Sequence, residues 1–107
     1  MKICITSQDD NLNASVDPRF GRAQYLIFVD IEKMEFETVK NLNVNTAGGA
    51  GTRTAQMVVD KGVETVITGN VGPNARRILD SANVKIIENV SGVVREVIEK
   101  FKKGELN

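Results

Sequence analysis

Short apolar runs alternate with polar segments in the first half of the chain, and each run has the length of a strand. Residues 2–6 and 25–30 are mostly apolar, and residues 35–40 alternate charged with less polar side chains, as strands do. Residues 30–33 separate the last two runs by the length of a hairpin loop. We therefore predict three strands, of which the second and third form an antiparallel pair.

The apolar spacing changes to that of helices in the second half. Apolar residues recur three and four positions apart over residues 55–62, 75–82 and 94–101, which predicts one buried helix face in each stretch. Residues 65–68 and 84–87 are short apolar runs between these helices. The expected order of elements is therefore βββαβαβα.

This order predicts one α/β domain over residues 1–107. A strand, a helix and the next strand prefer a right-handed parallel crossover, so the strands at residues 2, 65 and 84 should run parallel. The strand at Tyr25 should run antiparallel within the same sheet. We expect a mixed five-stranded sheet with helices on both faces.

The predicted topology brings the unusual loops to one edge of the sheet. Residues 17–22, 46–52, 69–74 and 88–92 all follow or precede the upper ends of strands, where open α/β sheets usually bind ligands. Three helix amino termini at this edge would present unpaired N–H groups and the positive end of the helix dipole. An anion is the ligand that such an edge favours.

The candidate binding residues come from these loops. Glycines allow a close backbone approach and positive φ values, as backbone anion sites require, and arginines supply planar donors. The candidates are Arg19, Phe20, Gly21, Arg22, Gly48, Gly49, Ala50, Gly51, Thr52, Asn70 and Gly72, with Arg53 or Arg76 as helpers. No catalytic residue and no metal ligand is assigned.

Each candidate also has a purely structural interpretation. The glycine-rich run can be a flexible entry to a helix, Gly72 followed by proline can be a helix start, and Phe20 can close the core. Arg19 can be a solvated charge. Cys4 lies between two isoleucines of a central strand, so an inert buried thiol is expected there.

Composition narrows the chemistry. The 14 basic and 14 acidic residues cancel, so no net field attracts nucleic acid or a membrane surface. The chain has no histidine and one cysteine, which excludes an internal disulfide and removes the usual imidazole base. No apolar run approaches the length of a membrane span. A cytoplasmic protein is expected.

Four motifs are similar to those of the dinitrogenase iron-molybdenum cofactor biosynthesis family. They are MKI at residues 1–3, DPRFGRA at 17–23, GGAG at 48–51 and ITGNVGPNA at 67–75. The resemblance extends from residue 1 to 104 and implies a ribonuclease H-like three-layer α/β/α fold. It also implies a small nitrogenase accessory factor-like domain that binds the iron–molybdenum cofactor or its iron–sulfur precursor. Relatives often have histidine where this chain has Arg19, so hydrogen bonds and charge are expected to replace direct metal ligation.

Two functions remain open at this point. The first is a non-catalytic binding or carrier domain for an anionic iron–sulfur or iron–molybdenum-type cluster, bound transiently, with cluster-assembly proteins as partners. The alternative is an enzyme or sensor that binds a phosphate-containing metabolite or nucleotide at the same edge, because backbone cradles accept either anion. A nuclease is not expected, since two-metal chemistry needs several carboxylates and the first strand carries Cys4.

The polar segments 8–17 and 41–51 are expected to be the least ordered parts of the chain.

Overall fold

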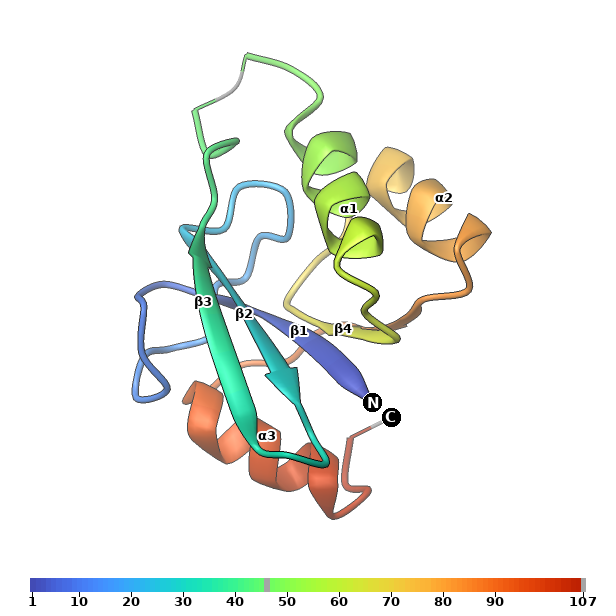
Figure 1. The fold of residues 1–107 in the computed structure, drawn as a ribbon. Coiled ribbons are helices and arrows are strands. Elements are labelled where there is room, and N and C mark those ends of the chain that lie inside the picture. Colours follow the sequence, from blue (N-terminus) through green and yellow to red (C-terminus); the bar gives the residue numbers. More distant parts are fainter. Residues whose placement is uncertain (46, 107) are drawn as a thin grey trace.

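The computed structural model describes residues 1–45 and 47–106, and it contains the predicted elements in the predicted order (Figure 1). The strands are β1 (Lys2–Ser7), β2 (Tyr25–Asp30), β3 (Glu35–Lys40), β4 (Thr65–Ile67) and β5 (Lys85–Ile87), and the helices are α1 (Ala50–Asp60), α2 (Pro73–Ser81) and α3 (Val94–Lys102). Strand ends differ from the sequence-based ones by a single residue. The predicted α/β fold is confirmed, while its ribonuclease H-like label stays a prediction.

The five strands form one mixed sheet in the order β3-β2-β1-β4-β5. β1 pairs with β4, and β4 with β5, in parallel, whereas β2 is antiparallel to both β1 and β3. The hairpin between β2 and β3 and the two crossovers follow the predicted directions. All three parallel strands therefore end at the same edge, which is where α1 and α2 begin.

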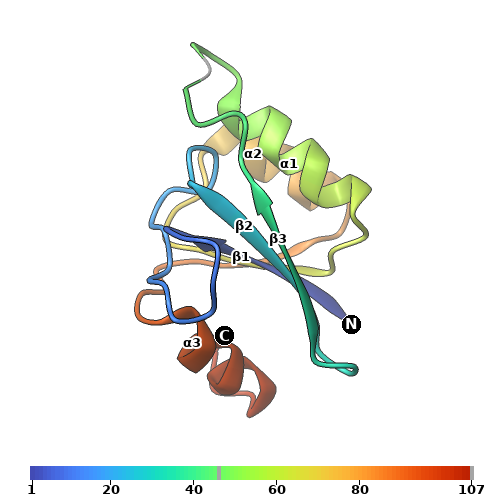
Figure 2. The same ribbon diagram turned by 60° about the vertical axis from the view of Figure 1, so that its left-hand side comes forward.

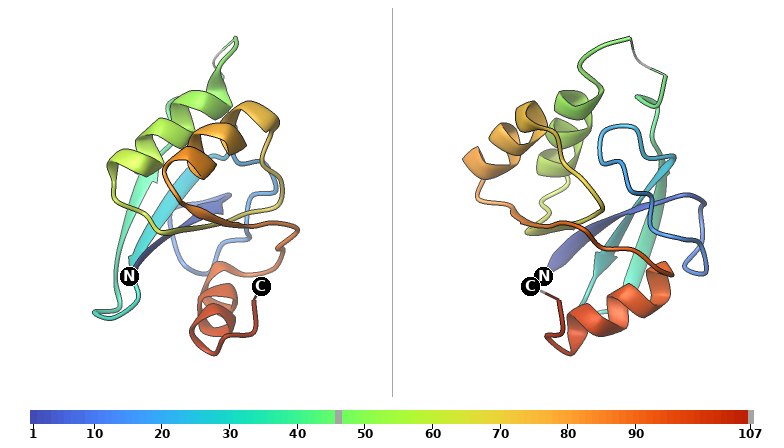
Figure 3. Two further views of the ribbon diagram at one scale, coloured as in Figure 1. Left: turned by 90° about the vertical axis from the view of Figure 1, so that its right-hand side faces the viewer. Right: turned by 180° about the vertical axis from the view of Figure 1, so that it is seen from behind.

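Helices cover both faces of the sheet, as predicted. α1 and α2 lie together on one face and α3 lies on the other, which the rotated views show plainly (Figures 2 and 3). Alternate residues of each strand enter two separate cores: Cys4, Leu26 and Phe28 lie in the core on the α1 and α2 side, and Ile3 and Ile5 lie in the core under α3. Burial of these apolar side chains on two faces is what positions the strand ends.

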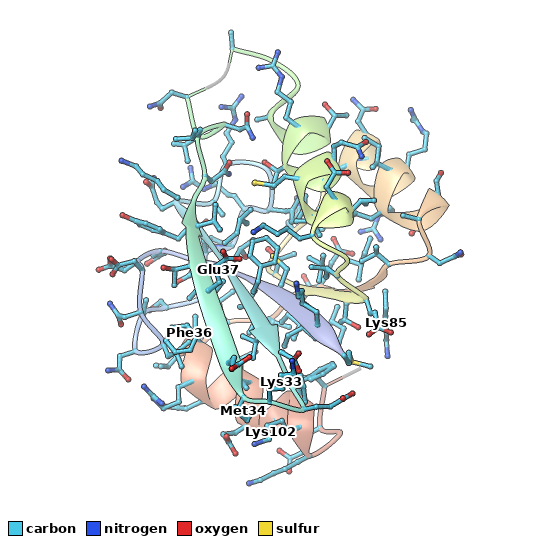
Figure 4. The ribbon with its side chains drawn as sticks, viewed as in Figure 1. Lys33, Met34, Phe36, Glu37, Lys85 and Lys102 are labelled. Carbon is cyan, nitrogen blue, oxygen red and sulfur yellow. The ribbon has the colours of Figure 1, made fainter. Side chains whose placement is uncertain are left out.

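β3 is an edge strand, and its side chains are mostly exposed. Phe36 pairs with Val29 of the α3-side core, whereas Glu37 pairs with Phe28 of the other core, so their side chains point to opposite faces (Figure 4). Glu37 Oε1 forms an ion pair of 2.8 Å with Lys61 Nζ just beyond α1. Charged residues on an edge strand also discourage pairing with a further strand.

The segment between β1 and β2 is held by backbone hydrogen bonds to the start of α3. Val16 N donates to the Gly92 carbonyl at 2.9 Å, and the N–H groups of Val94 and Arg95 donate to carbonyls of this segment at 2.9 and 2.8 Å. These bonds join part of the segment to α3, while the expectation that residues 8–17 are among the least ordered parts of the chain stays a prediction. Within the second polar segment, Thr46 lies outside the described residues.

Among the helices of the described residues, none is long and apolar enough to cross a membrane.

Candidate functional site

A groove of about 360 Å³ lies between the segment at residues 19–22 and the amino termini of α1 and α2. We call it the anion groove. It is lined by ten of the predicted residues, namely Arg19, Phe20, Gly21, Arg22, Gly49, Ala50, Gly51, Thr52, Asn70 and Gly72, together with Pro73, Asn74 and Ala75. The eleventh predicted residue, Gly48, is exposed beside the groove and does not line it. The structure thus brings together residues from three distant parts of the chain.

Asp17 fixes the entry of the chain into this groove. Its side chain is buried, and Oδ1 accepts the Arg19 N–H at 3.0 Å while Oδ2 accepts the Gln24 N–H at 3.2 Å. The Asp17 carbonyl accepts the Thr6 hydroxyl at 2.7 Å. One buried residue therefore closes the turn over residues 17–24 and ties it to the end of β1.

Two glycines allow the turn to lie directly against other backbone. A Cβ atom added to Gly21 would come within 2.7 Å of the Gly51 Cα, and one added to Gly69 would come within 2.5 Å of the Pro18 carbonyl oxygen. Phe20 N donates to the Asn70 carbonyl at 3.1 Å between these contacts, and the Phe20 ring is buried in the core. The Phe20 ring therefore closes the core, as its structural interpretation states, and main chain lies directly against main chain at Gly21 and Gly69.

The amino termini of α1 and α2 supply donors. Neither helix has a side-chain N-cap hydrogen bond, and the residue before α1, Gly49, has a φ of 72° that glycine adopts without strain. The N–H groups of Gly51, Thr52 and Asn74 have no hydrogen-bond partner among the described residues. Unpaired N–H groups and the positive helix ends make this part of the groove favourable for an anion.

The third expected amino terminus is not at the groove. α3 begins on the opposite face of the sheet, and the N–H groups of Val94 and Arg95 donate to the Ala14 and Leu12 carbonyls. The prediction of three helix ends facing one ligand is therefore wrong for α3. The prediction failed because the 8–17 segment folds back onto the start of α3, where its carbonyls accept the first N–H groups of the helix.

Two arginines line the groove, and they differ in their partners. Arg19 is 57% exposed and its Nε lies 3.4 Å from Asp17 Oδ1. Arg22 is exposed and donates from Nη1 to the Val44 carbonyl at 2.9 Å. Both guanidinium groups keep further donors available to a ligand.

The two suggested helper arginines do not line the groove. Arg53 is exposed on α1 and is not a lining residue. Arg76 pairs with Glu88 after β5 instead. The backbone N–H of Val71 lowers the pKa of the Glu88 carboxyl, and Arg76 lowers it further, while partial burial opposes both. Arg76 is thus a structural ion-pair partner.

Asn41 and Thr54 hold the groove in shape, and sequence analysis missed both. The Asn41 side chain is buried and donates from Nδ2 to the carbonyls of Gly21 and Ala23 at 3.1 and 2.9 Å. Thr54 Oγ1 donates to the same Gly21 carbonyl at 3.1 Å. These bonds clamp the backbone on both sides of Arg22. The signal that distinguishes Asn41 is the burial of a polar side chain directly after β3. Burial cannot be seen in a sequence.

The remaining reactive groups lie away from the groove. Cys4 is fully buried in the core, as expected, and burial raises the pKa of its thiol, which disfavours the reactive thiolate. Asp9 and Asp10 are exposed loop carboxylates. Within residues 1–45 and 47–106, no group of three or more His, Cys, Asp or Glu side chains is placed to hold a metal ion.

Comparisons with known proteins give a consistent result. The model of the family described as dinitrogenase iron-molybdenum cofactor matches residues 1–104. The apo form of the orange protein from Desulfovibrio gigas is 34% identical, with a TM-score of 0.94 over 99% of this chain and 90% of that one. A Thermotoga protein of the DUF35 family, solved by NMR, is 39% identical, with a TM-score of 0.86 over 99% of this chain and 90% of that one. An uncharacterized protein of Methanocaldococcus jannaschii is 28% identical over 109 residues, which cover 99% of this chain and 89% of that protein.

Proposed function

This chain belongs to the dinitrogenase iron-molybdenum cofactor family, and we propose that its anion groove holds an anionic iron–sulfur or iron–molybdenum-type cluster as cargo during cofactor assembly. The observation that carries the proposal is the groove itself, in which two uncapped helix amino termini and two arginines face one cavity. The description of the family, which names the iron-molybdenum cofactor of dinitrogenase, agrees with a cluster-related role. The cargo is bound transiently, and its donors and acceptors are cluster-assembly proteins.

The lining residues decide how such a cluster is held. None of the described lining residues is a histidine, a cysteine or a carboxylate, so the groove offers no ordinary protein ligand to iron or molybdenum. Main-chain N–H groups, the two guanidinium groups and the side chains of Thr52 and Asn74 can instead donate hydrogen bonds to an anion. The groove therefore suits a cluster that arrives with its own ligands complete.

A carrier is the simplest activity for this arrangement. Hydrogen bonds and dipoles bind an anion without forming a bond that must later be broken, so the cargo can leave intact. The competing function is an enzyme or sensor that binds a phosphate-containing metabolite or nucleotide, since the same donors recognise phosphate.

Anaerobic reconstitution tests the proposal. We expect the purified chain, mixed under reducing, oxygen-free conditions with a preformed anionic iron–sulfur cluster that carries its own small thiolate ligands, to retain a chromophore through gel filtration, with metal and sulfide in fixed proportion. A parallel thermal-shift panel of nucleotides and inorganic phosphate should leave the melting temperature unchanged. A colourless, metal-free protein that is stabilised by a nucleotide would replace the carrier with the competing function.

Arg22→Ala locates the binding to the groove. We expect the variant to lose roughly 1.5–3 kcal/mol of binding free energy, the range for a lost charged hydrogen bond, with little change in stability because the side chain is exposed. Added salt should weaken wild-type binding more than variant binding, since the variant has already lost a screened charge. Arg53→Ala removes the same charge from α1 outside the groove and should bind like wild type.

A further inference from the structure

A second hollow, of about 590 Å³, lies between α1 and α2 and adjoins the anion groove. We call it the helix groove. It is lined by Thr52, Gln56 and Val59 of α1 and by Asn74, Arg77, Ile78, Ser81 and Ala82 of α2 and its C-cap. Thr52 and Asn74 line both hollows. Whatever occupies the helix groove therefore sits next to the cargo site.

The spacing of the lining residues gives the helix groove its shape. Residues 52, 56 and 59 are separated by four and three positions, so they follow one face of α1 over two turns, or about 11 Å at 1.5 Å per residue. The lining residues of α2 also span two turns. A furrow between two adjacent helices on an outer face matches the ridge of a third helix, and helix-in-groove recognition uses this spacing.

The chemistry of the helix groove selects the kind of helix. Val59 and Ile78 are half-buried apolar side chains that would be shielded from water by an apolar stripe. Arg77 is the one charged residue of the lining, it is exposed, and it has no ion pair among the described residues. Its neighbour Arg76 differs, because it is already paired with Glu88. Charge complementarity therefore calls for a carboxylate opposite Arg77.

We propose that the helix groove docks an amphipathic helix of a partner protein, with an apolar stripe on Val59 and Ile78 and an acidic side chain at Arg77. The inference rests on the proposed carrier function, because it identifies the partner as the protein that delivers or removes the cargo. Docking over Thr52 and Asn74 places that protein at the mouth of the anion groove. The cargo then passes between the two proteins without release into solution.

Titration of the labelled chain with two synthetic helical peptides, followed by NMR, tests this docking surface. The peptides share one apolar stripe and differ only in carrying Glu or Lys beside it. We expect the acidic peptide to shift the amide signals of Val59, Ile78 and Ser81 and to bind at least fivefold more tightly than the basic one. Arg77→Glu should reverse the preference. Arg53→Glu, an equal charge change on α1 outside both grooves, should leave the preference as in wild type.

Several results would overturn the docking proposal. The two peptides could bind equally, neither could bind at millimolar concentration, or the amide shifts could be confined to other surfaces. Sedimentation could also show that the chain self-associates, with NMR placing Arg77 and Ile78 in the interface between copies. The titration contains no cluster, and Arg22→Ala should bind the acidic peptide like wild type. If the wild-type chain binds the acidic peptide but not the cluster, the result counts against the carrier function alone. If it binds the cluster but shows no preference for the acidic peptide, the result counts against the docking surface alone.

Discussion

The Asn41 amide ties the Arg22 segment to the rest of the fold. Its two N–H donors reach the Gly21 and Ala23 carbonyls, and its Oδ1 accepts the Asn43 N–H at 3.0 Å. Arg22 itself contributes charge but is exposed, so it does little to hold the backbone in place. Shape and charge at this part of the anion groove therefore depend on different residues.

Asn41→Ala should both destabilise the protein and weaken cargo binding. The change leaves two partly buried carbonyls without this donor, which costs roughly 1–3 kcal/mol, and it frees the backbone on both sides of Arg22. Urea denaturation measures the first effect, and cluster retention well below the unfolding transition measures the second. Asn45→Ala removes an exposed amide from the same segment and serves as the control. A variant as stable as wild type would show that the clamp is unimportant.

Residue patterns predicted which residues line the anion groove. They did not predict the hydrogen bonds that hold those residues in place. Loops that contain glycines and arginines at the upper strand ends supplied ten predicted lining residues, because topology alone brings those loops together. Arg76 was misplaced as a helper because its partner, Glu88, is distant in sequence and their contact depends on the packing of α2 beside β5. Asn41 was missed because nothing in a sequence shows that one polar loop residue is buried.

Between elements, main-chain contacts join the turn at residues 17–22 to α1 and β4. Gly21 touches the backbone of Gly51, and Gly69 touches that of Pro18. Backbone atoms cannot rotate away as the end of a flexible side chain can. The turn can approach α1 this closely only because Gly21 has no Cβ atom, and this contact sets the width of the anion groove.

Gly21→Ala should separate the turn from α1. The new methyl group would lie 2.7 Å from the Gly51 Cα, so we expect a loss of about 1–3 kcal/mol of stability, as for overpacked sites, and weaker cluster binding. Gly48→Ala is a matched control just outside the groove, because Gly48 is exposed, its φ is not positive and an added Cβ there meets no atom within 4 Å. Denaturation and reconstitution of both variants measure the difference. Equal behaviour of the two variants would refute the close contact.

The start of α3 shows where element-level prediction failed. Its apolar period and its position after β5 were predicted correctly, and the same reasoning placed its amino terminus at the ligand. The backbone of residues 12–14 instead accepts its first N–H groups. Such main-chain bonds involve no particular side chain, so the residue pattern contains no trace of them.

For the molecule as a whole, periodicity and chirality were enough to predict the fold. Strand and helix spacings gave the element order, and the right-handed crossover rule gave the parallel strands and the placement of helices on both faces. These rules concern regular backbone, which repeats along the chain. Loops have no such repeat, and this is why the hydrogen bonds between the 8–17 segment and α3 could not be predicted.

Global stability should depend on pH through Glu88. The pKa of the Glu88 carboxyl is lower in the folded protein than its value near 4.5 in the unfolded chain. The ionised carboxylate therefore stabilises the fold above pH 4.5, and this stabilisation is lost as the pH falls through the pKa of the folded state. We expect the free energy of unfolding of Glu88→Gln to decline less steeply than that of wild type below this pH. Urea denaturation at a series of acidic pH values measures both slopes. Parallel curves for Glu88→Gln and wild type would contradict the prediction.

The long-range bonds around residues 17–24 also bear on the order of folding. Asp17 and Thr68 are 51 residues apart and Gly21 and Thr54 are 33 apart, so closing these contacts costs loop entropy that the hairpin between β2 and β3 does not incur. The hairpin can form early, whereas the turn docks only after α1 and β4 are in place. A nascent chain thus has no assembled anion groove until the elements that carry residues 19–75 have packed, and binding of the proposed cargo would report that this part of the fold has formed.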